Sequence, residues 1–242
     1  MNDGYELTAK IEPFDSFWEA PKDIEKGYKS FGHFYKHNYL KYIPKEKSSR
    51  ILVVSCGTGY FLDLLKREGY PDVLGIDSFH EKIQYGKRKN LNCRVEKAFP
   101  FLRKNTDSYD VIVAEQEINH LAKHEIVMFL ELCMKNLNDN GILILHSLNG
   151  ANPITGSEAL AQNFDHYNTF TENSLHQILE HVGFNGVKVF PLNLYVFFTN
   201  PLNYIGLLYD KVITLIFRLN FMLYGKTNKI FTKKIGAVCR KK

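Results

Sequence analysis

The chain contains 242 residues, a length that favours one domain with additions over two separate domains. Hydrophobic residues make up 45% of it, which is ordinary for a globular protein that can bury a sizeable core. The 31 Lys and Arg exceed the 26 Asp and Glu and leave a formal charge of +5. This mild excess favours anionic small molecules slightly and does not by itself indicate a nucleic-acid partner, so none is expected.

Four cysteines occur without C-x-x-C spacing: Cys56, Cys93, Cys133 and Cys239. This pattern predicts a reduced, cytoplasmic protein. No N-terminal segment has the charged start, apolar middle and cleavage site of a signal peptide. The most apolar region, residues 212–224, contains Arg218 and falls short of the ~20 apolar residues that a membrane span requires. We therefore expect no transmembrane segment.

Residues 1–49 precede the first predicted strand and are rich in aromatic side chains. Asp23 can cap a helix in which apolar residues recur every three or four positions: Ile24, Tyr28, Phe31, Tyr35 and Tyr39. One interpretation is packing against the domain. The other is a lid over bound ligands, with Gly27 and Gly32 weakening the helix enough to let it move.

Residues 51–60, ILVVSCGTGY, predict a strand buried on both faces and then a tight glycine turn. Residues 60–68 have a helical apolar pattern that is closed by Gly69. Gly57 and Gly59 let the backbone approach a ligand at the C-terminal edge of a sheet, where open α/β folds bind nucleotides.

A second short apolar run, residues 72–77, ends in Asp77, 18 residues after Gly59. An acid at this position can accept hydrogen bonds from the ribose hydroxyls of a nucleoside. A dinucleotide fold would need a third small residue at position 62, where this chain has Leu62. A nucleoside without phosphates fits better, and S-adenosylmethionine is the common one.

The remaining chain alternates predicted helices and strands. Helices are expected at 79–89, 126–137 and 172–181, the last capped by Thr171, and strands at 92–95, 109–114, 141–146, 186–190 and 234–239. A polar excursion, residues 149–170, follows the fifth strand. An insertion before the last strand has helical spacing of Ile205, Leu208, Val212, Ile216 and Leu219.

Five segments in this order resemble the successive motifs of class I S-adenosylmethionine-dependent methyltransferases: VSCGTG (54–59), GID (75–77), AF (98–99), SYDVIV (108–113) and NDNGILI (138–144). The resemblance covers roughly residues 50–190. It implies an α/β, Rossmann-like seven-stranded sheet whose last two strands are antiparallel neighbours, with S-adenosylmethionine as methyl donor and S-adenosylhomocysteine as product. Residues 1–49 would be a helical lid, 50–190 the core, 191–232 a helical insertion and 233–242 the last strand. Val53 and Ser55 depart from the acid and glycine that the family often has there.

The donor site is expected at the C-terminal ends of the first strands: Ser55, Cys56, Gly57, Gly59, Asp77, Ser78, Ala98, Phe99 and, after the fourth strand, Glu115. The family resemblance places the pair at 98–99 against the adenine ring. The alternative for Phe99 is a role in the core.

The acceptor site is expected where the loop after the fourth strand, the excursion and the N-terminal helix converge. His120 is the first choice for general base, because it titrates near neutral pH, and His166 is the reserve. Glu117 could steer the imidazole or bind a cationic acceptor. Acceptor contacts are expected from Tyr35, Asn119, Asn149, Asn152 and Tyr167. His120 and His124 have metal-ligand spacing, but no H-E-x-x-H pattern or third ligand is evident, so no metal is expected.

A looser resemblance links residues 147–175 to methyltransferases of bacterial capsule and lipopolysaccharide gene clusters. It favours an oxygen or nitrogen of a sugar, nucleotide sugar or phosphorylated precursor as the small polar acceptor. Three alternatives remain open: a lipid or quinone acceptor at a membrane surface, an RNA acceptor, or a catalytically silent S-adenosylmethionine-binding partner. The insertion could also form a subunit contact.

Overall fold

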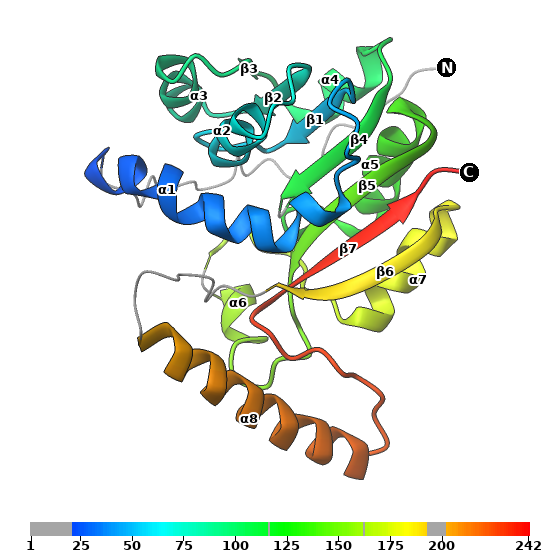
Figure 1. Cartoon of the computed structure of the whole chain (residues 1–242). Coiled ribbons are helices and arrows are strands. Elements are labelled where there is room, and N and C mark those ends of the chain that lie inside the picture. Colours follow the sequence, from blue (N-terminus) through cyan, green and yellow to red (C-terminus); the bar gives the residue numbers. More distant parts are fainter. Residues whose placement is uncertain (1–20, 116, 162, 193–201) are drawn as a thin grey trace.

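The computed structural model describes residues 21–115, 117–161, 163–192 and 202–242. Within them, one seven-stranded sheet has the order β3-β2-β1-β4-β5-β7-β6 (Figure 1). The strands are β1 (Ile51–Val54), β2 (Val73–Asp77), β3 (Cys93–Val95), β4 (Tyr109–Glu115), β5 (Leu137–Leu148), β6 (Asn185–Leu192) and β7 (Lys234–Arg240).

The strands β3, β2, β1, β4 and β5 are parallel, whereas β7 runs antiparallel to both β5 and β6. In β1 all four residues are buried, as expected for a central strand covered on both faces. The predicted sheet is confirmed, including the antiparallel pair at its end and the helical insertion before β7. The C-terminal ends of the parallel strands therefore meet at one edge of the sheet.

Helices cover both faces of the sheet (Figure 1). They are α1 (Pro21–Asn38), α2 (Tyr60–Arg67), α3 (His80–Arg88), α4 (Ala98–Lys104), α5 (Lys123–Asn136), α6 (Glu158–Ala161), α7 (Glu172–Val182) and α8 (Leu202–Leu223), with 3₁₀ turns η1 (Leu40–Tyr42) and η2 (Glu117–Asn119). One apolar cluster joins α4, α5 and α7 to the sheet, and another joins α1, α2 and α3 to its other face. None of the described helices is long and apolar enough to cross a membrane.

Two local features differ from the sequence expectations. Helix α1 begins at Pro21, so Asp23 lies in its first turn and is not the cap. Helix α4 was not predicted, because a seven-residue helix is too short to show a periodic pattern and contains Pro100. Proline is tolerated there because the first turn of a helix has no intrahelical partner for its N–H groups. Thr171 caps α7 as predicted, accepting a hydrogen bond from the Ser174 N–H.

Helix α1 packs on α2 through aromatic rings and one close backbone approach. The Phe31 ring stacks on Tyr60 with centroids 4.9 Å apart, and Tyr35 stacks on Phe61 at 4.8 Å. A Cβ at Gly27 would lie 2.5 Å from Cζ of Tyr60. Glycine at position 27 therefore permits contact between the helices, and its role here is packing, whatever flexibility it adds.

A pair of alanine substitutions separates packing from helix propensity. Gly27→Ala should lower the free energy of unfolding by about 1–3 kcal/mol, because the methyl group overlaps the Tyr60 ring. Gly32→Ala should leave it unchanged or raise it by up to about 1 kcal/mol, because a Cβ there meets only the flexible guanidinium of Arg67 at 3.1 Å. Urea denaturation followed by circular dichroism measures both, and equal stability of the two variants would contradict the packing role.

Candidate functional site

The turn after β1 contains three residues with left-handed backbone conformation. Their φ angles are 56° at Ser55, 57° at Gly57 and 89° at Gly59. A glycine at position 55 would adopt this conformation at lower cost than serine. A Cβ at Gly57 would meet no atom within 4 Å, whereas one at Gly59 would lie 2.8 Å from Leu91. Gly57 therefore borders open space where a ligand can approach, and Gly59 is required for packing.

Asp77, at the end of β2, ties this turn to the neighbouring strand. Its Oδ2 accepts a hydrogen bond from Gly57 N at 2.8 Å, and its Oδ1 accepts one from Phe79 N at 2.9 Å. Burial raises the pKa of Asp77, while the two backbone N–H groups oppose that shift. Each carboxylate oxygen can accept a further hydrogen bond, so Asp77 can hold the turn and still receive ribose hydroxyls. The adjacent Ser78 is exposed.

Glu117, in η2 after β4, points to the same turn. Its carboxylate accepts a short hydrogen bond from the Ser55 hydroxyl. Burial raises the pKa of Glu117, the bond from Ser55 lowers it, and the Asp77 charge raises it. In the described part of the chain the hydrogen-bond partner of this carboxylate is Ser55, and the expectation that Glu117 steers the His120 imidazole or binds a cationic acceptor stays a prediction.

The other expected donor contacts differ in burial: Phe99 is buried, whereas Ala98 and Cys56 are partly exposed. The Phe99 side chain is 4% exposed and packs against Phe129, with ring centroids 6.0 Å apart. Ala98 packs on the same apolar cluster. This arrangement matches the core alternative for Phe99, and a contact with adenine stays a prediction. The Cys56 thiol lies under the turn, where burial raises its pKa well above the ordinary value.

His120, Asp165 and His166 come together although 45 residues separate the first two in sequence. His120 Nδ1 lies 3.0 Å from Asp165 Oδ2, and the two imidazole rings are 4.9 Å apart. Burial lowers the pKa of His120, and the Asp165 carboxylate opposes that shift. Asp165 is 4% exposed, and its Oδ1 has no hydrogen-bond partner among the described residues. An oriented, neutral imidazole is thus held at the loop after β4.

These three side chains also form a group whose ligand atoms lie within 4.8 Å of one another. The sequence pointed only to the spacing of His120 and His124, and the structure instead groups His120 with Asp165 and His166. Three of the four ring nitrogens already have hydrogen-bond partners. His120 Nδ1 contacts Asp165, His166 Nδ1 lies 2.6 Å from the Ala159 carbonyl, and His166 Nε2 lies 3.3 Å from the Asn163 amide. The hydrogen bonds fit a positioned base, and we assign no metal.

The asparagines expected at the acceptor site connect segments of the chain. Asn119 is fully buried, and its amide bonds the Asn168 carbonyl at 2.6 Å and the Leu148 N–H at 3.2 Å. Asn149 donates to the carbonyls of residues 230 and 232, and Asn152 donates to that of residue 231. Tyr167 is 47% exposed. An acceptor contact from any of these four residues stays a prediction.

A buried polar network lies beneath α1. It includes Tyr39 and His146, which the sequence did not indicate as site residues. Tyr35 donates to Glu115 at 2.9 Å, and the Tyr39 hydroxyl lies 2.9 Å from His146 Nδ1. Burial raises the pKa of Glu115 to about 7 and lowers that of Lys234 to about 8. Helix α1 thus contacts the ends of β4 and β5. His146 follows the apolar run GILIL, and that interruption was the available signal for it.

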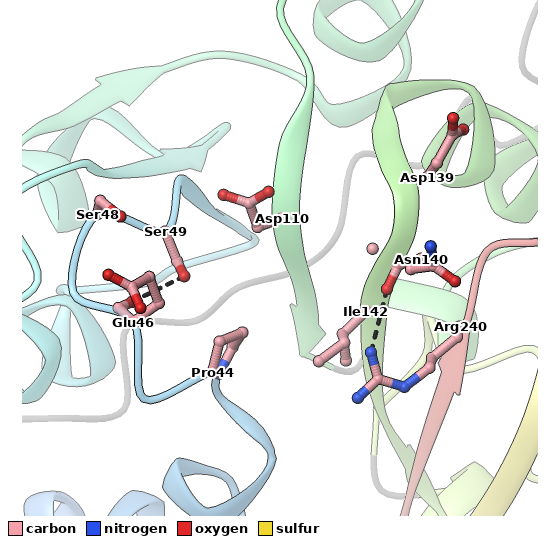
Figure 2. Close-up of a pocket in the computed structure, with 10 residues that line it drawn as sticks. Pro44, Glu46, Ser48, Ser49, Asp110, Asp139, Asn140, Ile142 and Arg240 are labelled. Atoms are coloured by element: carbon pink, nitrogen blue, oxygen red, sulfur yellow. Dashed lines mark hydrogen bonds between the residues drawn. The ribbon is translucent and has the colours of Figure 1, made fainter.

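A cavity of about 360 Å³ lies at the opposite edge of the sheet, near the starts of β4 and β5 (Figure 2). Asp110, Asn140 and Arg240 are among its lining residues. The Asp110 carboxylate accepts from Arg50 N and from the Asn138 amide, both at 2.8 Å, and Arg240 donates to the Asn140 carbonyl at 3.1 Å. Because Asp110 and Arg240 already have hydrogen-bond partners in the protein and the cavity lies at the other edge of the sheet from the turn after β1, we do not assign the chemistry to it.

The comparisons with known proteins agree with the geometry. The family model described as a methyltransferase domain matches residues 28–189. A methyltransferase from Archaeoglobus fulgidus that depends on S-adenosylmethionine aligns with a TM-score of 0.65 at 20% identity, covering 92% of this chain and 100% of that one. The plantazolicin methyltransferase BpumL with bound S-adenosylhomocysteine aligns with a TM-score of 0.56 at 17% identity, covering 91% and 87%.

A third solved structure is the complex between the Haloferax volcanii Trm112 methyltransferase activator and a methyltransferase. It aligns with a TM-score of 0.66 at 14% identity, covering 95% of this chain and 98% of that one. No curated protein sequence matches the chain. The family match spans more than half of the residues, and the glycine turn and the acid after β2 lie inside it. The chain therefore belongs to the methyltransferase domain family and is an S-adenosylmethionine-dependent methyltransferase.

Proposed function

We propose that this enzyme methylates a hydroxyl group of a small polar acceptor, with His120 as the general base and Asp165 as the residue that positions it. The observation that carries the proposal is the 3.0 Å contact between His120 Nδ1 and the buried Asp165 carboxylate. A carboxylate on one ring nitrogen fixes the tautomer and leaves the other nitrogen free to accept a proton.

The residues around the turn after β1 fit S-adenosylmethionine. Its ribose hydroxyls and ammonium group are hydrogen-bond donors, and the turn presents the carboxylates of Asp77 and Glu117 together with open space over Gly57. When bound, the donor supplies a methyl group on a positively charged sulfur. The protein then has to orient the acceptor, exclude water and remove the acceptor proton where the acceptor's pKa requires it.

We infer that the acceptor enters beside η2 and the excursion after β5. Support comes from the position of His120 beyond the end of β4 and from the exposed Tyr167 on the excursion. The sequence resemblance favours a sugar, nucleotide sugar or phosphorylated precursor used in surface glycan synthesis. An amine acceptor is the second candidate, because Glu115 and Glu117 place acidic groups at the same edge of the sheet. A screen of these acceptor classes for methyl transfer tests the assignment directly.

Substitution of Asp77 tests the donor site. Asp77→Asn should weaken S-adenosylhomocysteine binding by about 1.5–3 kcal/mol, roughly 10- to 150-fold, because the ribose hydroxyls lose a charged acceptor. Asp72→Asn is the matched control, since Asp72, just before the start of β2, is exposed and, among the described residues, forms its ion pair with Arg50. Isothermal titration calorimetry measures both. Unchanged affinity in the Asp77 variant would reject the assignment.

Removal of His120 tests the base. His120→Ala should lower turnover by about a hundredfold or more while S-adenosylmethionine still binds. His176→Ala is the control, because His176 lies on α7 and pairs with Glu180 on the surface. Near wild-type turnover of the His120 variant would transfer the role to His166 or indicate an amine acceptor that needs no base.

The pH dependence separates the roles of His120 and Asp165. Turnover should rise with pH as the imidazole loses its proton and should level off before neutral pH, because burial lowers the pKa of His120. Asp165→Asn removes the charge that opposes this shift. The rising limb should therefore move to lower pH while the plateau rate falls. A pH profile of kcat that does not move would contradict the positioning role of Asp165.

A further inference from the structure

Helix α8 carries an unusual concentration of exposed apolar side chains. Of the eighteen large hydrophobic residues that are exposed in the described part of the chain, twelve lie between Leu202 and Tyr224. Monomeric soluble proteins rarely expose an apolar patch of this extent without a binding partner. None of these residues has a role in the proposed methyl transfer.

The exposed residues form one continuous face. We define the apolar face of α8 as Ile205, Leu208, Val212, Leu215, Ile216 and Leu219, whose side chains are between 45% and 65% exposed. At about 100° per residue, Tyr204 and Tyr209 lie at its two borders, roughly 140° apart. Tyrosines at the borders of an apolar helix face suit the level of lipid headgroups.

The opposite side of α8 holds the helix on the protein. Phe217 and Phe221 pack on Phe231, with ring centroids 5.7 and 4.7 Å apart. Asp210, the one acid of α8, lies on this side too, and partial burial raises its pKa. The backbone carbonyl of Phe231 accepts a hydrogen bond from Asn152 in the excursion after β5. The apolar face therefore lies on the side of α8 opposite Phe217 and Phe221 and is exposed. Figure 1 shows α8 set apart from the sheet and the helices that cover it.

The charged residues around the apolar face of α8 indicate which kind of surface it can bind. Residues 202–233 contain five Lys and Arg against one acid, so this segment carries most of the formal charge of +5. Lys211 and Arg218 lie beside the apolar face, and Lys226 and Lys229 follow in the connection to β7. Two copies of the chain pairing through α8 would bring like charges together. An anionic lipid surface is complementary to both the apolar face and its cations.

We propose that the apolar face of α8 binds the surface of a membrane rich in anionic lipids. The helix lies in the plane of the interface, with its apolar side chains among the acyl chains and the lysines at the phosphates. The contacts through Phe231 and Asn152 connect the bound helix to the excursion at the catalytic edge.

Vesicle binding of the full chain tests this proposal. The protein should co-sediment with vesicles of phosphatidylcholine containing about one third phosphatidylglycerol, and at least tenfold less with phosphatidylcholine alone. The triple substitution Leu208→Ser, Val212→Ser and Leu219→Ser should abolish binding, with the circular dichroism spectrum and S-adenosylhomocysteine affinity unchanged. Absence of wild-type binding, or equal binding to both vesicles, would overturn the proposal.

A charge variant keeps the test decisive if the apolar substitutions disturb folding. Lys211→Gln, Lys226→Gln and Lys229→Gln together should weaken vesicle binding about tenfold or more. The control replaces three exposed lysines far from α8 by glutamine: Lys45, Lys104 and Lys135. It removes the same charge and should bind almost like the wild type. Equal weakening in both variants, or a dimer that depends on the apolar face and forms without vesicle binding, would refute a membrane surface as the partner.

Discussion

The hydrogen bond between the Gly57 N–H and the Asp77 carboxylate joins the two chain segments on which the donor site depends. It fixes a turn with three left-handed residues against the end of β2, and it requires β1 and β2 to be adjacent parallel strands. The adjacency follows from burial, since β1 is covered by helices on both faces and must pair on both edges. An extended strand, a strained turn and a buried acid thus form a single unit at the edge of the sheet.

Helix α1 makes the second connection to this edge. Two of its tyrosines and the tyrosine that follows it reach three different segments. Tyr28 donates to the Thr58 carbonyl in the turn, Tyr35 donates to Glu115 at the end of β4, and Tyr39, just after α1, contacts His146 in β5. Burial raises the pKa of Glu115 to about 7, and the hydrogen bond from Tyr35 opposes that shift. These contacts fit the packing interpretation of the N-terminal helix, and its movement as a lid stays a prediction.

The proposed chemistry and the proposed membrane contact use different parts of the molecule that share one connection. The base and its positioning carboxylate lie on the loop after β4 and on the excursion after β5. That excursion is bonded through Asn149 and Asn152 to residues 230–232, and Phe231 of that segment packs on α8. The proposed acceptor site and the proposed membrane contact are therefore linked through residues 230–232.

The sequence by itself determined the sheet, because strands and the glycine turn are local patterns. They show in the sequence as apolar runs, two glycines and an acid at position 77. The sequence also showed the helical character of the insertion. Only the tertiary structure decided which polar groups meet. In the structure His120 contacts Asp165, 45 residues away in sequence, and Glu117 accepts a hydrogen bond from Ser55. Asn149 and Asn152 connect the excursion to residues 230–232. The structure also showed that the periodic residues of α8 are exposed, since periodicity marks one face of a helix and does not say whether that face is buried.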